Sequence, residues 1–204
     1  FVLPPILSQA RHQHVLGALH EESETVFALT RRLTLRPGWP EDAPALSLAI
    51  GHEAVVRNLS RAPWPYTLGD AESFLSLPRA PHQPRFQIMT RGENRLIGGT
   101  ELIALGGRVH ELGYWLTPDS WGKGYATEAG RAVIEMARHT LGSERLIGRH
   151  MVDNPASGRV LRKLGFVETG SSRLFSLARG AEVDCVDLAL DLVEPCSEPL
   201  PIAA

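Results

Sequence analysis

The sequence predicts an α+β fold in which helices cover a mainly antiparallel sheet, and three observations support this class. Three central segments, 86–91, 96–105 and 109–116, tend toward a period of two and are joined by short turns, which is typical of an antiparallel meander. Segments with helical spacing of apolar residues precede and follow the meander. A chain of 204 residues is long enough to bury about 70% of its unfolded surface around one core.

The remaining elements extend this sheet at both ends. Further strands are expected at 32–36, 145–152, 166–177 and 183–192, which gives about seven in total. Helices are expected at 41–50, 52–59, 68–77, from about 126 to 140, and between Asn154 and Gly165. The chain is therefore divided into an N-terminal appendage (1–29), a folded domain (30–193) and a flexible, Pro-rich C-terminal tail (194–204).

Composition excludes several classes of function. A net charge of −2 provides no general basic field, so direct nucleic-acid binding is not expected. Cys185 and Cys196 form no CxxC pair, which predicts two reduced thiols, and His12 and His14 lack a third ligand, so no metal is expected. No apolar stretch approaches the roughly 18 residues of a membrane span, and we expect a cytoplasmic protein that does not bind membranes.

The first motif is a glycine loop between the third meander strand and a helix, with Gly122 and Gly124 separated by Lys123. Free N–H groups and the positive dipole end at a helix start favour a phosphate, and glycine lets it approach the main chain. The alternative is a tight turn without a ligand. A Walker A loop is excluded because Lys123 lies between the glycines, and Thr127 occupies the place of the third glycine of a dinucleotide fingerprint.

The second motif is Asp153-Asn-Pro-Ala-Ser157, followed by a short helix and Lys163-Leu-Gly-Phe166. Alone, Asn154 and Ser157 could simply cap that helix. Both motifs together, with a strand between them, resemble the GNAT superfamily of N-acetyltransferases, specifically its ribosomal-protein (RimJ/RimL-like) branch. The matching segments are Thr30–Pro37, Pro65–Thr67 with Asp70-Ala71, Glu111–Leu116, Trp121–Ala129, and Asn154–Ser157 with Lys163–Phe166. The resemblance covers about residues 30 to 192.

This resemblance implies a mixed sheet splayed in the middle, with acetyl-CoA as the acyl donor and the arm of the cofactor between two strands. The residues expected to bind the cofactor are Leu116, Gly122, Lys123, Gly124, Tyr125, Ala126, Thr127 and Asn154. The loop amides would hold the pyrophosphate, and the main chain of Leu116 would pair with the pantetheine arm. The superfamily pattern opens the loop with Gln or Arg, whereas this chain has Trp121, so the phosphates are expected to rest mainly on amides.

The resemblance also implies two catalytic candidates. Glu111 would act as the general base for the amine through a water, and Ser157 would protonate the leaving thiolate. Each has a structural alternative: Glu111 could anchor a neighbouring strand, and Ser157 could cap its helix. A main-chain N–H near Tyr114 and Trp115 would bind the acetyl carbonyl, and His110, His139 and His150 are expected to be structural.

The predicted function is acetyl transfer to a primary amine, with the N-terminal amine of a protein or peptide as one acceptor class. In this superfamily the acceptor is selected by the loop between the first two helices, here about 51–70, and by the turn at Arg179-Gly180. The alternatives are a small-molecule or drug acetyltransferase, a sensor that binds acyl-CoA without turnover, and a scaffold. The oligomeric state stays open, with a homodimer as one alternative.

Overall fold

The computed structural model describes residues 28–78, 80 and 82–193. The tail from residue 194, Cys196, His12 and His14 therefore lie outside the described residues, as does nearly all of the predicted appendage. The predicted division of the chain into three parts stays a prediction.

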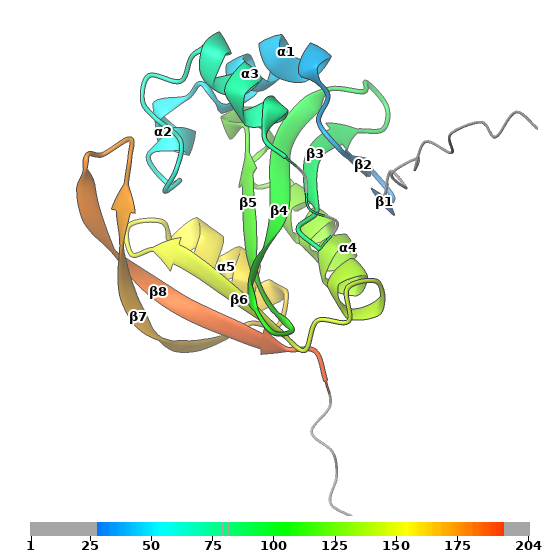
Figure 1. Ribbon diagram of the computed structural model, residues 1–204, viewed down its shortest axis with the longest axis vertical. Helices are drawn as coiled ribbons and strands as arrows, with labels where there is room; N and C mark the ends of the chain where they lie inside the picture. Colours follow the sequence, from blue (N-terminus) through cyan, green and yellow to red (C-terminus); the bar gives the residue numbers. More distant parts are fainter. Residues whose placement is uncertain (1–27, 79, 81, 194–204) are drawn as a thin grey trace, which may run out of the picture.

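The structure confirms the predicted α+β class with one mixed sheet of eight strands in the order β1-β2-β3-β4-β5-β6-β8-β7 (Figure 1). The strands are β1 (Ala28–Leu29), β2 (Leu33–Arg36), β3 (Arg85–Thr90), β4 (Leu96–Gly106), β5 (Val109–Leu116), β6 (Arg145–Met151), β7 (Val167–Ser176) and β8 (Ala181–Asp191). The strand beyond the predicted seven is β1, inside the predicted appendage. Two residues are too few to show a periodicity, so the sequence could not indicate this strand.

The predicted meander consists of β3, β4 and β5, which pair antiparallel. The turn between β4 and β5 uses Gly106 and Gly107 at φ of 104° and 58°. Positive φ is unfavourable for residues with a side chain, so this tight connection requires glycine. The meander forms one half of the sheet, together with β1 and β2.

The two halves of the sheet meet only briefly. Strands β5 and β6 pair in parallel at three positions, from Val109 with Arg145 to Glu111 with Ile147. Beyond them β5 remains paired with β4 up to Leu116, and β6 remains paired with β8 up to Met151. The facing edges of β5 and β6 are therefore without a strand partner from residues 112 and 148 onward, which gives the predicted splay in the middle of the sheet.

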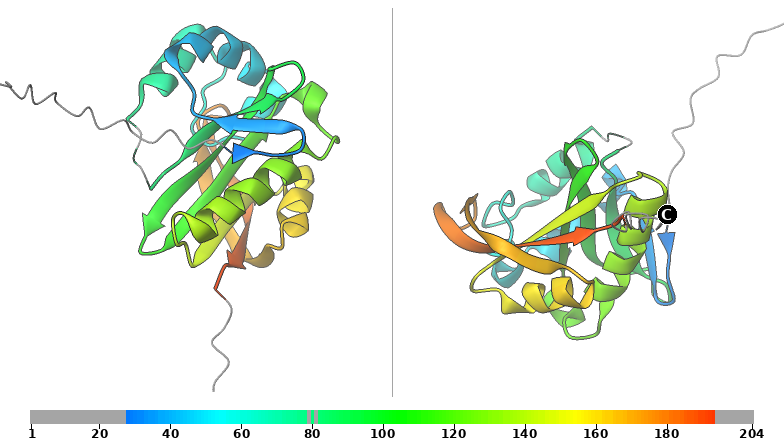
Figure 2. Two further views of the ribbon diagram at one scale, coloured as in Figure 1. Left: turned by 90° about the vertical axis from the view of Figure 1, so that its right-hand side faces the viewer. Right: turned by 90° about the horizontal axis from the view of Figure 1, so that it is seen from below.

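Helices cover both faces of the sheet (Figure 2). Helices α1 (Ala43–Ile50), α2 (Glu53–Val56) and α3 (Leu68–Ser76) lie on one face, where α1 and α3 pack with Met89 and Leu96. Helices α4 (Tyr125–His139) and α5 (Pro155–Lys163) cover the other face, around a core that includes Leu112 and Leu116. Short 3-10 turns, η1 (Pro40–Asp42) and η2 (Pro118–Ser120), precede α1 and the glycine loop.

Helix α2 is shorter than the predicted segment 52–59. After Val56 the chain tightens: the N–H groups of Asn58 and Leu59 donate to the carbonyls of Val55 and Val56, three residues back, which is a 3-10 pattern. The carbonyl of Ser60 then accepts a hydrogen bond from the N–H of Leu177 at 2.9 Å, and that of Leu59 accepts one from Ser176 Oγ at 3.2 Å, which holds this segment against the β7–β8 hairpin. Among the described residues, no helix is both long and apolar enough to cross a membrane.

Candidate active site

A cavity of about 1130 Å³ follows the gap between β5 and β6 and extends to both faces of the sheet. Its walls come from α1, α2 and α3 on one side and from α4 and α5 on the other. Pockets for single small ligands have volumes of roughly 300–1,000 Å³. This cavity is therefore large enough for an extended ligand together with a second one.

One end of the cavity is the glycine loop that precedes α4. Gly122 and Gly124 have φ of 73° and 80°, and no heavy atom lies within 4 Å of the position that a Cβ of Gly122 would occupy. Helix α4 has 15 residues and no side-chain cap, so the N–H groups of Tyr125, Ala126 and Thr127 have no acceptor in the described part of the chain. Exposed amides beside an open main chain at a helix N-terminus suit a diphosphate.

A clamp from the β1–β2 turn fixes this loop. Glu128 accepts hydrogen bonds from Thr30 Oγ1 at 2.6 Å, from the Arg32 main chain at 2.8 Å and from Arg32 Nε at 2.7 Å. Arg32 also donates to the carbonyl of Lys123 at 3.0 Å and stacks on Tyr125. Burial acts to raise the pKa of Glu128, but these hydrogen bonds outweigh it, so the pKa lies below its ordinary value. Thr30, Arg32 and Glu128 lie within segments that carry the family resemblance, but the sequence analysis did not predict the contact between them.

Two cations of α5 also line the cavity. Arg159 and Lys163, one helical turn apart on α5, line it, and neither forms an ion pair with a described residue. Arg162, on another face of α5, is paired with Glu168 at 3.3 Å. The predicted Lys123 is exposed and is not among the lining residues. Sequence analysis had not assigned Arg159 or Lys163 to the cofactor site, although their i, i+4 spacing places them on one helix face.

The main chain of β5 offers hydrogen-bonding groups to the gap. The N–H of Thr117 donates to the carbonyl of Ile97 at 2.8 Å. Because main-chain direction alternates along a strand, Leu116 and Tyr114 direct their N–H and C=O groups away from β4 and toward the gap. The Leu116 carbonyl already accepts a bond from Trp121 Nε1 at 2.8 Å. The predicted pairing of a pantetheine arm with Leu116 is thus limited to its N–H unless Trp121 moves.

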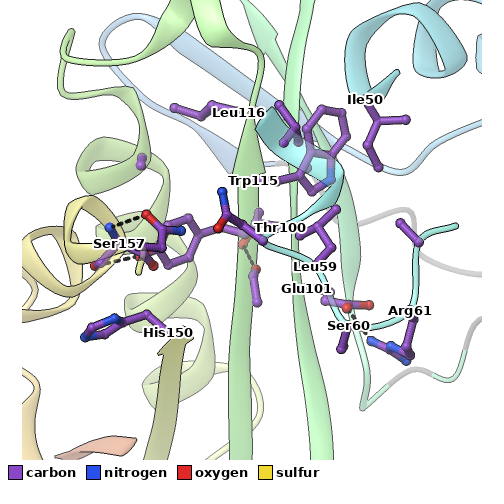
Figure 3. A pocket seen from close by; sticks show the side chains of 18 of the residues that line it. Ile50, Leu59, Ser60, Arg61, Thr100, Glu101, Trp115, Leu116, His150 and Ser157 are labelled. Carbon is purple, nitrogen blue, oxygen red and sulfur yellow. Dashed lines mark hydrogen bonds and ion pairs between the residues drawn. The ribbon is translucent and has the colours of Figure 1, made fainter. Parts of the chain in front are cut away.

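The two catalytic candidates lie on opposite sides of the sheet. Side chains alternate along β5, so Glu111 shares the α1–α3 side with Trp115, while Tyr114 lies on the other side, where it contacts Ser157. Figure 3 shows Trp115 and Ser157 on opposite sides of the sheet. The carboxylate of Glu111 is about a quarter exposed, and its one ion pair among the described residues is with Arg149 at 4.0 Å. Arg149 binds Asp187 much more closely, at 2.6 Å, and this hydrogen bond raises the pKa of Arg149. Glu111 is therefore only weakly held by its neighbour.

Ser157 lies in the first turn of α5, on the other side of the gap. Its main-chain N–H donates to Asn154 Oδ1 at 3.3 Å, so Asn154 caps the helix, and the predicted cofactor contact of Asn154 stays a prediction. The hydroxyl of Tyr114 lies 2.7 Å from Ser157 Oγ and 3.0 Å from the Ser157 carbonyl. Burial raises the pKa of Tyr114 to about 12, and the hydrogen bond with Ser157 acts against this rise. The sequence analysis missed this contact between residues 43 apart.

The three histidines have structural contacts. His110 bonds to Ser143 and to the carbonyl of His82, and His139 lies 3.2 Å from Glu135. His150 bonds through Nδ1 to the Met151 carbonyl, and its buried Nε2 has no hydrogen-bond partner among the described residues. That nitrogen packs against α5 so closely that a Cβ on Gly158 would lie 2.5 Å from it. His150 thereby sets the distance between β6 and α5.

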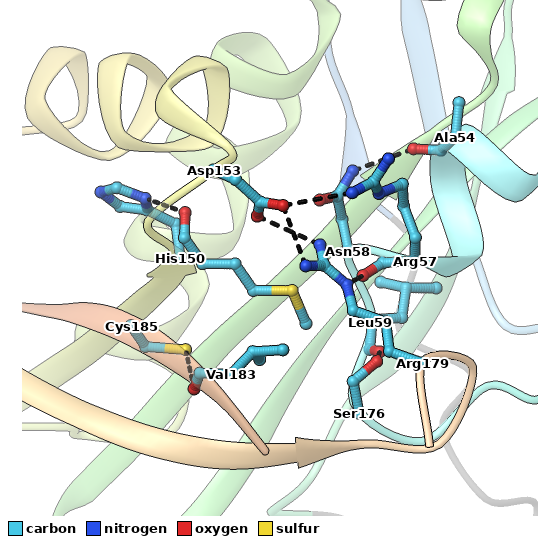
Figure 4. Close-up of polar contacts among 11 residues, drawn as sticks. Ala54, Arg57, Asn58, Leu59, His150, Asp153, Ser176, Arg179, Val183 and Cys185 are labelled. Atoms are coloured by element: carbon cyan, nitrogen blue, oxygen red, sulfur yellow. Dashed lines mark hydrogen bonds and ion pairs between the residues drawn. The ribbon is translucent and has the colours of Figure 1, made fainter. Parts of the chain in front are cut away.

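Away from the glycine loop, Arg57 and Asp153 line the cavity and form ion pairs, together with Arg179, in a set that we call the Asp153 cluster (Figure 4). Asp153 accepts two bonds from Arg179, at 2.9 and 3.1 Å, and one from Arg57 at 3.2 Å. Arg179 also donates to the Arg57 carbonyl at 2.7 Å. These contacts, from Arg179 first, hold the pKa of Asp153 below its ordinary value. The cluster joins the two segments predicted to select the acceptor, 51–70 and the Arg179 turn.

The wall behind this cluster is mainly apolar. Ile50, Leu59 and Trp115 line it, and Glu101 lies nearby, paired with Arg61 at 2.6 Å (Figure 3). Glu101 has a close ion pair with Arg61, whereas Glu111 has only a distant one with Arg149. The negative charge of Glu111 is therefore less neutralised than that of Glu101. A positively charged amine that enters this end therefore meets a carboxylate within an apolar wall.

The structure is thus that of an α+β protein with an open mixed sheet, a glycine loop before a helix, and a cavity through the splay of the sheet. A family model described as the acetyltransferase (GNAT) domain matches residues 32–167, and the chain belongs to this family. The chain is 30% identical over 167 residues to the uncharacterized N-acetyltransferase YoaA of Bacillus subtilis, covering 76% of this chain and 90% of the relative.

Solved structures share the fold. A GNAT acetyltransferase from Bacillus anthracis superimposes with a TM-score of 0.72 at 23% identity, covering 82% of this chain and 99% of that one. RimL, a ribosomal L7/L12 α-N-protein acetyltransferase solved with coenzyme A, superimposes with a TM-score of 0.69 at 20% identity, covering 80% and 96%. The predicted superfamily is thus confirmed.

Proposed function

We propose that this protein is an N-acetyltransferase that moves an acetyl group from acetyl-CoA to a primary amine by direct attack in a ternary complex. One observation carries the proposal: the gap between β5 and β6 leads from unpaired loop amides to a point flanked by Glu111 on one face and Ser157 on the other. Acetyl-CoA supplies the activated thioester. The amides of Gly122 to Thr127 and the cations of Arg159 and Lys163 suit its phosphates.

The chain's own residues have distinct tasks in this reaction. Glu111 accepts, through a water, the proton that the ammonium group must lose before it can attack. The N–H of Tyr114, which points into the gap, is placed to bind the acetyl oxygen as negative charge develops there. Ser157 delivers a proton to the leaving sulfur. Glu111 and Ser157 stay on separate faces, so the base can serve the amine on one side of the gap while the hydroxyl serves the sulfur on the other.

We further propose that the acceptor is the N-terminal amine of a protein or peptide, as in the RimJ/RimL-like branch, and that the enzyme acts in the cytoplasm. The likeness to RimL and the matching motif segments support this acceptor class. The apolar wall around Ile50, Leu59 and Trp115 favours an uncharged neighbour to the amine over a polycationic drug. A small-molecule amine is the alternative acceptor.

Two measurements test the function. Titration calorimetry with coenzyme A should show binding, and intact-mass detection should show acetylation within a panel of peptides and small amines. Glu111→Gln should lower kcat about 100-fold or more at unchanged coenzyme A affinity. Glu135→Gln, on the exposed face of α4 beside His139, is the matched control.

Each failure has its own meaning. Binding of coenzyme A without turnover on any acceptor would instead support the sensor, and absence of binding would support the scaffold. Equal rates for Glu111→Gln and the wild type would remove Glu111 from the mechanism.

A further inference from the structure

The contact between Tyr114 and Ser157 joins a buried phenol to the predicted proton donor. Tyr114 comes from the third meander strand, and Ser157 comes from the first turn of α5, across the gap. Both side chains line the cavity. Among the described residues, Tyr114 is the one recorded hydrogen-bond partner of the Ser157 hydroxyl.

The two hydroxyls can share their protons in two ways. A phenol has one proton, and the Ser157 carbonyl can only accept. If the phenol donates to that carbonyl, at 3.0 Å, Ser157 Oγ must donate to the phenol oxygen. If the phenol donates to Oγ, at 2.7 Å, the serine proton is free to point into the cavity. The 2.7 Å separation is the usual one for a hydroxyl pair, so both arrangements are accessible by rotation alone.

A serine hydroxyl is a far weaker acid than a phenol. Transfer of its proton to a leaving thiolate would leave an alkoxide beside α5, which is unfavourable unless that oxygen takes another proton at the same time. Tyr114 is held at the correct distance to supply one. Its pKa of about 12, raised by burial, keeps the phenol fully protonated at neutral pH, so the proton is present when the serine oxygen needs it.

We infer that Tyr114 is the positioning residue of the proton donor, orienting Ser157 and passing it the proton that reaches the leaving sulfur. This rests on the proposed function. As the C–N bond forms and the C–S bond breaks, sulfur takes the Oγ proton of Ser157 and Oγ takes the phenol proton of Tyr114. The amine loses two protons: the ammonium proton passes through Glu111 to solvent before the attack, and the second goes to Glu111 through water as the C–N bond forms. Glu111 then releases its proton to solvent and the tyrosinate regains one, so the net reaction releases one proton and charge balances.

Substitution separates this role from simple packing. Tyr114→Phe keeps the ring and removes the hydroxyl, and it should lower kcat 10- to 100-fold at unchanged coenzyme A affinity. Ser157→Ala should lower kcat by a similar factor. The double variant should be no slower than the slower single variant, because the two groups act as one unit. Thermal unfolding of each variant checks that the fold is intact, and losses that multiply in the double variant would overturn the inference.

Fluorotyrosines of increasing acidity at position 114 give the readout that a structural role would not move. The alkaline limb of the kcat profile should shift to lower pH in step with the phenol pKa measured by fluorine NMR. The fluorine signal should also respond more to coenzyme A than to its desulfo analogue. Tyr66 is the matched control: it lines the same cavity and has a pKa raised to about 12, by burial and by Asp70, but has no hydroxyl contact with Ser157.

The outcomes are distinguishable. The inference is supported if the alkaline limb of the kcat profile shifts with the phenol pKa at position 114 and does not shift with the phenol pKa at position 66. If the wild type is active but the alkaline limb does not shift in the fluorotyrosine variants at position 114, the inference is overturned and the proposed function is not. No transfer by the wild type to any acceptor overturns the proposed function and this inference together.

Discussion

The two ends of the cavity are built by different means. The cofactor end consists of main chain: a loop with two glycines at positive φ and the free amides of a helix start, all within residues 121 to 127. The acceptor end consists of side chains brought together from distant segments, such as Arg57, Asp153 and Arg179.

This difference determines what each end can bind. Amides fixed by a helix recognise any diphosphate of the right size, so one local arrangement suffices for one donor. Ion pairs between exposed side chains are weak singly and are readily exchanged for others. Single substitutions should therefore have smaller effects at the proposed acceptor end than at the proposed donor end. The following predictions test this contrast.

The largest effect is expected where the main chain itself is changed. Gly124→Val places a branched side chain at φ 80° in the loop, at the point where the amides would meet phosphate. Loss of two charge-assisted hydrogen bonds should weaken coenzyme A binding about 100-fold. Titration calorimetry measures the change in affinity.

Gly107→Val is the control for backbone strain. Gly107 also has positive φ, 58°, but lies in the β4–β5 turn and does not line the cavity. Both variants should lose about 1–2 kcal/mol of folding stability, and only Gly124→Val should lose coenzyme A affinity. Equal weakening of binding in both variants would contradict a main-chain site at the loop.

The same contrast explains how much the sequence could predict. Gly122, Gly124 and the helix after them form a continuous segment, so local rules indicated the loop and its place after a strand. The period-two segments likewise indicated the meander. The contact of Tyr114 with Ser157 and the Asp153 cluster depend on strand order and on where the β7–β8 hairpin turns back. Both features depend on residues that are far apart in the sequence, so the pattern of neighbouring residues in a single sequence does not predict either of them.

Helix length shows the same limit from the opposite direction. Apolar spacing predicted a helix from 52 to 59, but α2 ends at Val56 and the chain continues to Leu59 in tighter i→i+3 turns before it meets the β7–β8 hairpin. Apolar spacing does not distinguish these tighter turns from an α-helix. At the glycine loop, by contrast, the tertiary contacts of Arg32 with Glu128 and Lys123 support the conformation that the local sequence favours.

A smaller effect is expected from the cations beside the loop. Arg159→Gln with Lys163→Gln should weaken coenzyme A binding about three- to tenfold, because each exposed charge contributes up to about 1 kcal/mol. The difference from the wild type should shrink in about 1 M salt, where the screening length falls to roughly 3 Å. Arg162→Gln, on the same helix but paired with Glu168, should bind coenzyme A like the wild type. If Arg162→Gln weakened binding equally, general helix charge would explain the effect and Arg159 and Lys163 would have no specific part.

The smallest effect should come from the Asp153 cluster, and it should fall on the other substrate. Asp153→Asn keeps the shape of the side chain but removes the charge that holds Arg57 and Arg179. The KM for the acceptor should rise about two- to fivefold, the scale of exposed ion pairs, while coenzyme A affinity stays the same. A change in coenzyme A affinity alone would show that the cluster belongs to the donor end, contrary to the contrast drawn above.

The pH dependence of this variant has a definite sign. The pKa of Asp153 is lowered in the folded protein, so its carboxylate stabilises the fold above the unfolded pKa of about 3.9, and this stabilisation is lost as the pH falls through the folded pKa. The difference in thermal midpoint between the wild type and Asp153→Asn should be constant from pH 8 to about pH 5 and should close below about pH 4. A difference that instead grew on acidification would mean that the neighbours of Asp153 destabilise its carboxylate, and the ion pairs of the cluster would not then stabilise the fold.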